Sequence, residues 1–310
     1  MISQPEPFEI EGADGGPLRG DVYAAGTAGH GADAAGVAAG ASGPVPARVA
    51  VISHGFRGYK DWGLLLLAAQ RVAAEGIPAV TFNFGSSGIT DREGSFGEPE
   101  RFRKGTYGDQ LEDLGRVIDW AVRRVGSSPS AETSAGHVPT AQEPRIGLIG
   151  HSRGGALSIL HAASDTRVRC VAALASPSAI GVWPDHYFEA WKRGEPVQLR
   201  DFRTKSHLAL GPELYRDLES RRAHYNVLAA AESLRVPLLL IQGDRDRSVP
   251  LAEAHELREH APQALTEYRE IAGAGHNFSA GDKIRRTPPQ LLDVIELVAA
   301  WMRRWLIADA

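Results

Sequence analysis

Short apolar runs that alternate with longer helical stretches constrain the fold of this chain more than any other feature. Such runs are typical of strands that are buried on both faces of a sheet. Helical patterns separate several of them, as in WGLLLLAAQRVAAEG, which ends at Gly76. Strands that alternate with helices predict βαβ units, and therefore an α/β fold with a mostly parallel sheet. The runs are RVAVIS (48–53), IPAVTF (77–82), RIGLIG (145–150), RCVAAL (169–174) and VPLLLI (236–241).

Three segments interrupt this alternation. Segments 26–47 and 126–144 are rich in Ala, Gly, Ser and Pro, cannot bury enough apolar surface to order themselves, and are predicted to be mobile polar inserts. Region 177–235 separates two predicted strands and is too long for a simple connection, so we expect a small cap or lid there. The predicted core domain then comprises 1–176 and 236–310, and its first two strands form an antiparallel hairpin around a Gly-rich turn.

Composition narrows the functional classes. The 310 residues carry a net charge of −4, which gives no electrostatic reason to expect a nucleic acid or an anionic membrane as partner. No apolar stretch reaches membrane-spanning length, and the N-terminus lacks the pattern of a secretory signal. The single cysteine, Cys170, excludes an intrachain disulfide. We expect a cytoplasmic protein that needs no cofactor and no metal, and a homodimer is left open.

A G-x-S-x-G motif, Gly150-His151-Ser152-Arg153-Gly154, joins a predicted strand to a predicted helix. A sharp turn at this junction would lift the Ser152 hydroxyl out of the sheet, within reach of a base. The alternative is a simple helix start, because glycines form turns and serines cap helices. The motif alone does not decide between the two.

The loops that follow the other strands favour the chemical interpretation. Ligands bind at the carboxyl ends of parallel strands, and here Ser152, an aspartate and His276 follow three strands in that order. A serine nucleophile needs a base, and the base needs a carboxylate that orients it. The backbone amides of Phe56 and Arg153 are the expected donors to the oxyanion.

Two of these assignments have competitors. His54 and His151 also flank the predicted site and compete with His276 for the role of base. Their motifs suit them better to shaping the oxyanion loop and the turn at Ser152. Asp244 lies two residues before Asp246 near the same strand end, where either carboxylate could simply cap a turn.

The motifs SHGFRGYKDWG (53–63), GHSRGG (150–155), GDRDRSVP (243–250) and GAGHNF (273–278) closely resemble those of the α/β-hydrolase superfamily. The resemblance is nearest to serine esterases and dienelactone-hydrolase-like members; dehalogenases and epoxide hydrolases have Asp as nucleophile. It implies an eight-stranded, mostly parallel sheet with helices on both faces. It also implies Ser152 as nucleophile, His276 as general base and acid, and Asp246, rather than Asp244, as the orienting carboxylate.

Two groups of residues bear on the substrate. Trp183, Tyr187 and Trp191 in the predicted cap are spaced for one helix face, with Pro184 in the first turn. They either pack the cap or line an apolar pocket. His54 and Arg57 are expected to line the same pocket. The side chains of Arg57 and Arg153 either form ion pairs or recognise a substrate carboxylate.

The sequence therefore predicts a serine hydrolase that cleaves a small-molecule carboxylic ester through an acyl-enzyme intermediate. Thioesters, lactones and small peptides are alternative substrates of the same residues. A hydrolase-fold binding protein without activity is a rival of another class, although the intact Ser, Asp and His set argues against it.

Overall fold

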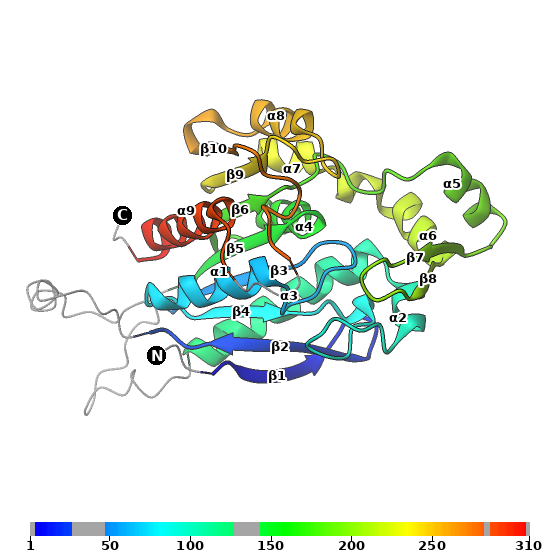
Figure 1. Ribbon diagram of the computed structural model, residues 1–310, viewed down its shortest axis with the longest axis horizontal. Coiled ribbons are helices and arrows are strands. Elements are labelled where there is room, and N and C mark those ends of the chain that lie inside the picture. The colour runs from blue at the N-terminus through cyan, green and yellow to red at the C-terminus, as the bar shows by residue number, and fades with distance from the viewer. Residues whose placement is uncertain (1–3, 27–46, 127–142, 282–285, 308–310) are drawn as a thin grey trace, which may run out of the picture.

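The computed structural model describes residues 4–26, 47–126, 143–281 and 286–307 of the chain. The inserts predicted at 26–47 and 126–144 therefore fall, apart from their ends, outside the described residues. An eight-stranded sheet with the order β1-β2-β4-β3-β5-β6-β9-β10 forms the centre of the molecule (Figure 1). Its strands are β1 (Glu6–Glu11), β2 (Pro17–Tyr23), β3 (Arg48–Ser53), β4 (Ala79–Phe82), β5 (Arg145–His151), β6 (Val168–Leu174), β9 (Leu238–Gly243) and β10 (Thr266–Ile271).

The sheet is parallel from β4 to β10 and antiparallel at its other end. Strand β3 pairs in parallel with β4 and β5, and the series continues through β6, β9 and β10. Strand β2 pairs antiparallel with both β1 and β4. The predicted fold class is thus confirmed, including the antiparallel hairpin at the start of the chain.

Helices cover both faces of the sheet. Successive residues of a strand point to opposite faces, so the apolar strands bury side chains on both sides. In β3, Ala50 and Ile52 pack under α1 and α9 in one core cluster, whereas Val49 and Val51 pack with α3, α4, α7 and α8 in a second one. The helices of the body are α1 (Gly63–Ala74), α2 (Pro99–Lys104), α3 (Tyr107–Gly126), α4 (Arg153–Ala162), α7 (Val227–Ser233), α8 (Leu251–His260) and α9 (Pro289–Leu306).

A cap projects from one end of the body between β6 and α7 (Figure 1). It has a hydrophobic cluster of its own, which includes Trp191, Leu210 and Leu214 and is joined to the body through Phe102 of α2 and Tyr107 of α3. The cap consists of α5 (Asp185–Lys192), the two-stranded sheet of β7 (Val197–Arg200) and β8 (His207–Leu210), α6 (Pro212–Arg221) and a 3₁₀ turn, η4 (Arg222–Tyr225).

The end of the predicted cap region belongs to the packing of the body. Helix α7 lies within 177–235, yet its Val227 and Ala231 pack in the second core cluster with α4 and α8. Residues 213–234 form two helices, α6 and α7, which are separated by the 3₁₀ turn and a break at Asn226. The Asn226 side chain caps α7 by accepting a 3.0 Å hydrogen bond from the Ala229 amide.

The aromatic stripe of the cap also differs in detail from the expectation. Trp183 precedes α5 rather than lying in it, and Pro184 is the residue that caps the helix. The residue before a proline disfavours helical backbone angles, which accounts for this boundary. The three aromatic side chains nevertheless meet, with ring centroids 5.8 Å apart for Trp183 and Tyr187 and 5.9 Å apart for Trp183 and Trp191.

Candidate active site

Ser152 occupies a strained turn between β5 and α4. Its backbone has φ 55° and ψ −126°, a conformation that a residue with a side chain rarely adopts. Of the six non-glycine residues with positive φ in the described chain, five lie in loops that follow strands of the eight-stranded sheet: Arg57, Ser152, Ala175, Phe278 and Ser279. Strain of this kind gathers at functional sites, where the surrounding structure enforces it.

Glycines allow this turn to form. A Cβ atom at Gly150 would lie 2.1 Å from the Gly154 carbonyl oxygen, and one at Gly154 would lie 2.5 Å from that of Ser53. A Cβ atom at Gly55 would lie 2.8 Å from Cβ of Ser152 and 3.3 Å from its Oγ. The loop after β3 is therefore in direct contact with Ser152, and the motif glycines at both positions are required by close packing.

His276 lies beside this turn and is held by Asp246. Its Nδ1 atom donates a 2.8 Å hydrogen bond to Oδ2 of Asp246, and its ring centroid is 4.8 Å from that of His151, the neighbour of Ser152. Within the described residues, neither the Ser152 hydroxyl nor Nε2 of His276 has a hydrogen-bond partner. Neither group is therefore engaged by another part of the described chain.

Asp246 is buried and saturated with donors. Its Oδ1 accepts from the amides of Ser248 and Val249, at 2.8 and 2.9 Å, and its Oδ2 also accepts from the Gln242 side chain at 2.9 Å. Burial alone would raise the pKa of Asp246, but the hydrogen bonds from His276 and from these amides outweigh it and leave the pKa below its ordinary value. The carboxylate therefore stays ionised opposite the imidazole.

Asp244, the other candidate, has a different role. Its Oδ1 accepts a 2.7 Å hydrogen bond from the Gly273 amide, so it tethers the loop that carries His276. Of the two carboxylates, only that of Asp246 contacts the histidine ring in the described structure. Asp246 thus contacts the His276 ring, and Asp244, two residues earlier, holds the loop that carries His276.

His54 and His151 are buried and uncharged. Burial lowers the pKa of His54 to about 4 and that of His151 to about 3. Nε2 of His54 accepts from the Phe84 amide while Nδ1 bonds the Gly55 carbonyl oxygen at 2.8 Å, so the proton resides on Nδ1. Nε2 of His151 donates to the His276 carbonyl oxygen at 2.9 Å. Each imidazole therefore fixes a loop of the site.

The two expected oxyanion donors frame the space in front of Ser152. Phe56 follows the glycine that contacts Ser152, and Arg153 is the first residue of α4. Neither amide donates a hydrogen bond within the described part of the chain. Free amides at a helix start and in a neighbouring loop are the donors that a developing oxyanion requires.

The side chain of Arg153 lies in an aromatic enclosure. Its guanidinium carbon is 4.3 Å from the ring centroid of Phe56, 5.0 Å from that of Tyr107 and 5.8 Å from that of Trp183. Burial among these rings lowers the pKa of Arg153 below its ordinary value, although an arginine remains charged. Tyr107 also accepts a 3.1 Å hydrogen bond from the Trp183 indole, which anchors the cap to α3.

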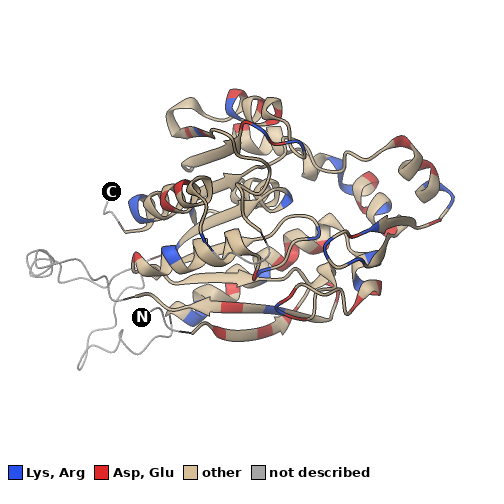
Figure 2. Ribbon diagram, viewed as in Figure 1, with Lys and Arg blue, Asp and Glu red and all other residues tan. Residues whose placement is uncertain are grey.

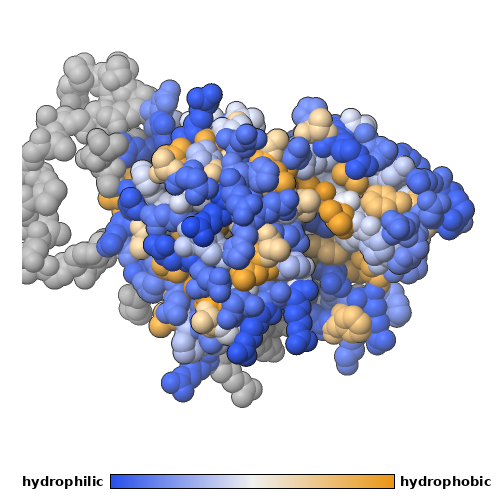
Figure 3. All heavy atoms as spheres, turned by 90° about the horizontal axis from the view of Figure 1, so that it is seen from above, coloured by the Kyte–Doolittle hydropathy of each residue, from blue (hydrophilic) through white to orange (hydrophobic). Residues whose placement is uncertain are grey.

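A small pocket lies beside this guanidinium and between the body and the cap. Arg57 lines it, with Nη1 3.3 Å from the Arg200 carbonyl oxygen and 3.8 Å from Oδ2 of Asp201. Seen from above, hydrophobic side chains gather where the body meets the cap (Figure 3). The other residues that line the pocket are His54, Gly55, Phe56, Ser86, Ser87, Phe102, Gly105, Gln110, Arg153, Leu210 and Leu214.

The three aromatic residues predicted in the cap lie at different depths. Trp183 reaches the site, with its ring centroid 5.5 Å from that of Phe56. Trp191 is 2% exposed and donates a 3.0 Å hydrogen bond to the Leu210 carbonyl oxygen inside the cap. Tyr187 lies between the two indoles, at 5.8 Å from each.

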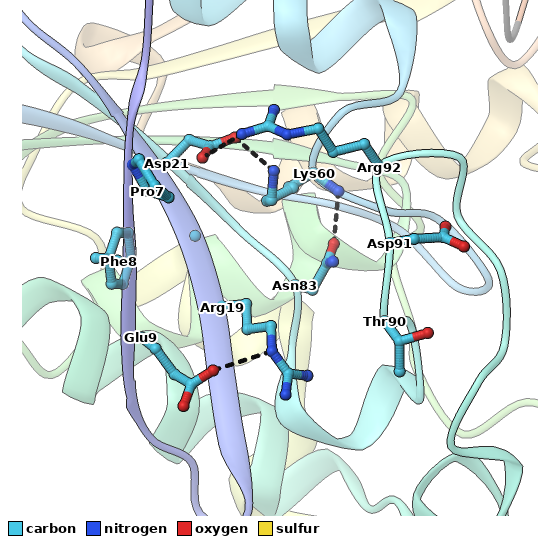
Figure 4. Close-up of a pocket in the computed structure, with 11 residues that line it drawn as sticks. Pro7, Phe8, Glu9, Arg19, Asp21, Lys60, Asn83, Thr90, Asp91 and Arg92 are labelled. Atoms are coloured by element: carbon cyan, nitrogen blue, oxygen red, sulfur yellow. Dashed lines mark hydrogen bonds and ion pairs between the residues drawn. The ribbon is translucent and has the colours of Figure 1, made fainter.

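A second cavity of about 370 Å³ lies away from Ser152, beside β1 and β2 (Figure 4). The charged groups around it are paired with one another. Nζ of Lys60 bonds Asp21 at 2.5 Å, and Arg92 bonds the same carboxylate at 2.8 Å, while Arg19 bonds Glu9 at 3.0 Å. None of the residues that line this cavity is a serine, cysteine or histidine, so Ser152 and its neighbours remain the candidate active site.

Several residues of the site carry no signal in the sequence. Tyr107 and Gln110 come from a segment with no recognisable motif, and only the fold brings them to Arg153. Gln242 is the last polar residue of an apolar strand, and its contact with Asp246 depends on the loop that follows. Their spacing along the chain gives no basis for predicting these contacts.

Three wider features complete the description. Across the described ranges, no three His, Cys, Asp or Glu side chains come together as ligands for a metal ion. No helix in the same part of the chain is both long and apolar enough to span a membrane. Acidic and basic residues are interspersed along the ribbon rather than segregated by sign (Figure 2).

Comparison with known proteins agrees with the fold. The model of the alpha/beta hydrolase family matches residues 49–284. The fold is similar to that of the esterase domain of a Rhodothermus marinus protein, with a TM-score of 0.59 and 18% identity over 98% of this chain and 100% of that one. Est1E from Butyrivibrio proteoclasticus gives a TM-score of 0.62 and 16% identity, over 97% and 99% of the two chains.

A third structure has a different activity in its name. A puromycin-hydrolyzing peptidase of Mycobacterium tuberculosis gives a TM-score of 0.62 and 17% identity over 99% of this chain but 40% of its own. A search of curated proteins found no significant match. At these identities the solved structures establish the fold, and the chemistry must be argued from the site itself.

Proposed function

Because the chain belongs to the alpha/beta hydrolase family, we propose that it is a serine hydrolase that cleaves carboxylic esters through an acyl-enzyme intermediate. The observation that carries this proposal is the arrangement of three side chains from three loops. Ser152 stands at a strained turn, its neighbour His151 contacts His276, and Nδ1 of His276 is bonded to the ionised Asp246.

A residue of the site acts in each step of the proposed reaction. His276 takes the proton of Ser152 through Nε2 as the hydroxyl oxygen attacks the ester carbonyl. The imidazolium is stabilised by Asp246, and the amides of Phe56 and Arg153 hold the oxyanion. The imidazolium next protonates the leaving alcohol, after which a water activated by the same nitrogen releases the acid.

The first experiment compares p-nitrophenyl acetate, butyrate and decanoate as substrates of the wild type and of Ser152→Ala. We expect hydrolysis by the wild type and a loss of at least about 10³-fold in kcat for the variant, because the covalent step needs the hydroxyl. Ser164→Ala is a matched control, since this exposed serine lies just beyond the end of α4. Circular dichroism verifies that each variant is folded.

Two results would contradict the proposal. One is a folded wild type that hydrolyses none of the three esters, and the other is full activity in Ser152→Ala. Labelling by a fluorophosphonate probe tests the nucleophile independently of substrate choice. Comparing kcat/KM for a butyryl ester, a butyryl thioester and an aminoacyl p-nitroanilide then decides which acyl bond the site prefers.

A further inference from the structure

We propose that the pocket beside Arg153 binds a carboxylate of the substrate, so that the enzyme prefers esters that carry a free carboxylate elsewhere in the molecule. This inference rests on the proposed function, because it names the substrate class of the same site. The carboxylate takes no part in bond breaking and serves only to hold the ester in place.

Arg153 is the cation that this proposal needs. Its guanidinium is stacked on Phe56 and Tyr107, yet no carboxylate contacts it within the described residues. Other partly buried arginines of the chain are paired with acids: Arg101 bonds Asp14 at 2.7 Å, and Arg167 bonds Asp165 at 2.7 Å. A partly buried cation without a counter-ion is costly, and a substrate carboxylate would reduce that cost.

Unpartnered polar atoms gather in the same pocket. Among the described residues, Nε of Arg57, Oγ of Ser86 and Oε1 of Gln110 are buried and have no hydrogen-bond partner, and all three residues line the pocket with Arg153. Ser86 is only 4% exposed. Buried polar groups are almost always satisfied. The Arg57 and Ser86 atoms are donors and can serve a carboxylate, whereas Oε1 of Gln110 is an acceptor and needs a donor such as a water.

The charged side chains around the pocket leave one positive charge for a negatively charged ligand group. Asp201 lies 3.8 Å from Arg57 and partly balances it, whereas Arg153 is left unbalanced. One net positive charge beside hydroxyl and guanidinium donors matches a planar carboxylate, which arginine binds through two parallel N–H groups. The apolar side chains of Leu210 and Leu214 on the cap side of the pocket would contact the carbon chain that bears it.

The test uses two pairs of substrates that differ only in this charge. In the first, p-nitrophenyl hemiadipate is compared with p-nitrophenyl adipamate, so the charge lies on the acyl side. In the second, 4-acetoxybenzoate is compared with 4-acetoxybenzamide, so it lies on the alcohol side. The measured quantity is the ratio of kcat/KM for the acid to that for the amide in each pair.

We expect the wild type to favour the acid by about tenfold or more in one pair, as a charge-assisted hydrogen bond implies. Arg153→Gln should bring that ratio close to one, and Arg153→Lys should retain part of it. Both variants keep the backbone amide at residue 153. The matched control is Arg258→Gln on α8, because Arg258 is also stacked on an aromatic ring, 5.4 Å from the centroid of Tyr268, but outside the pocket; its ratio should equal that of the wild type.

The outcomes separate this inference from the proposed function. If the wild type hydrolyses acid and amide equally in both pairs, the hydrolase proposal stands and the carboxylate inference is wrong. If no ester is hydrolysed, calorimetric binding of hemiadipate and adipamate to Ser152→Ala decides. Tighter binding of the acid that disappears in the Arg153→Gln background supports the pocket while the proposed reaction fails, and equal binding overturns the inference.

Discussion

The backbone of Ser152 illustrates how a single residue can oppose the stability of its own protein. With φ at 55° and ψ at −126°, the residue occupies a region that only glycine adopts without strain. Such strain costs about 1–3 kcal/mol and persists because the surrounding structure enforces it. Here Gly150 and Gly154 leave room for the turn, and Gly55 packs against the Ser152 side chain itself.

This strain leads to a prediction for two inactive variants. Ser152→Ala and Ser152→Gly both remove the hydroxyl, but only glycine relieves the backbone. We expect Ser152→Gly to exceed Ser152→Ala in free energy of unfolding by about 1 kcal/mol. Urea denaturation of the two variants measures the difference. Equal stabilities, or a more stable alanine variant, would contradict the interpretation of the turn as strained.

Part of the candidate site could be predicted residue by residue, and part could not. Ser152, Asp246 and His276 stand in local motifs after strands, so their placement at one edge of the sheet follows once parallel strands are predicted. The enclosure of Arg153 has no such local cause. It combines Phe56 after β3, Tyr107 of α3 and Trp183 before α5, and only the tertiary structure brings together positions so distant along the chain.

At the scale of elements, the cap divides its aromatic residues between two tasks. Trp191 is almost fully buried and ties α5 to β8 through the Leu210 carbonyl oxygen. Trp183, at the base of the cap, touches both Tyr107 and Phe56. The first therefore stabilises the cap itself, and the second connects the cap to the loop in front of Ser152.

Alanine substitutions should separate the two tasks. Trp191→Ala is expected to destabilise the cap by about 3 kcal/mol, because it leaves a large cavity, and hydrogen exchange of cap amides should accelerate. Trp183→Ala is expected to change KM and the chain-length profile of ester hydrolysis with a smaller effect on exchange. A change of chain-length preference in Trp191→Ala with unaltered exchange would reverse this assignment.

The elements that sequence patterns failed to predict share a physical cause. Strands β7 and β8 have four residues each, too few for a periodic signal, and their pairing depends on the hydrophobic cluster of the cap. The break at Asn226 depends on one side-chain cap. Most strands and helices of the body are longer than these and strongly patterned, and for them pattern and tertiary packing agree.

Over the whole molecule, three buried titratable groups set the expected response of stability to pH. The unfolded pKa of histidine is about 6.5, whereas burial lowers the pKa of His54 to about 4 and that of His151 to about 3. At a pH between the folded and the unfolded pKa of each histidine, the unfolded chain binds more protons than the folded one. Stability therefore falls as pH falls below about 6.5. Asp113 acts in the opposite direction, because burial raises its pKa to about 6 from about 3.9 when unfolded.

Variants can separate the effect of the two histidines on stability from the opposite effect of Asp113. Between pH 4 and 6, each histidine should lower the free energy of unfolding by about 1.4 kcal/mol per pH unit on acidification, and Asp113 should offset one of them. His151→Gln keeps a donor for the His276 carbonyl oxygen and should make the dependence shallower, whereas Asp113→Asn should make it steeper. Urea denaturation at several pH values measures the slopes, and three identical slopes would contradict the account.

The position of the cap has a consequence for how proteins of this shape diversify. The cap is inserted between β6 and α7, while α7 itself packs in the body and leads into β9, the neighbour of β6. The strand–helix–strand unit is therefore complete without it. The cap could therefore be exchanged as a unit, which would change the molecules that reach the site. The loops that carry Ser152, Asp246 and His276 would keep their positions.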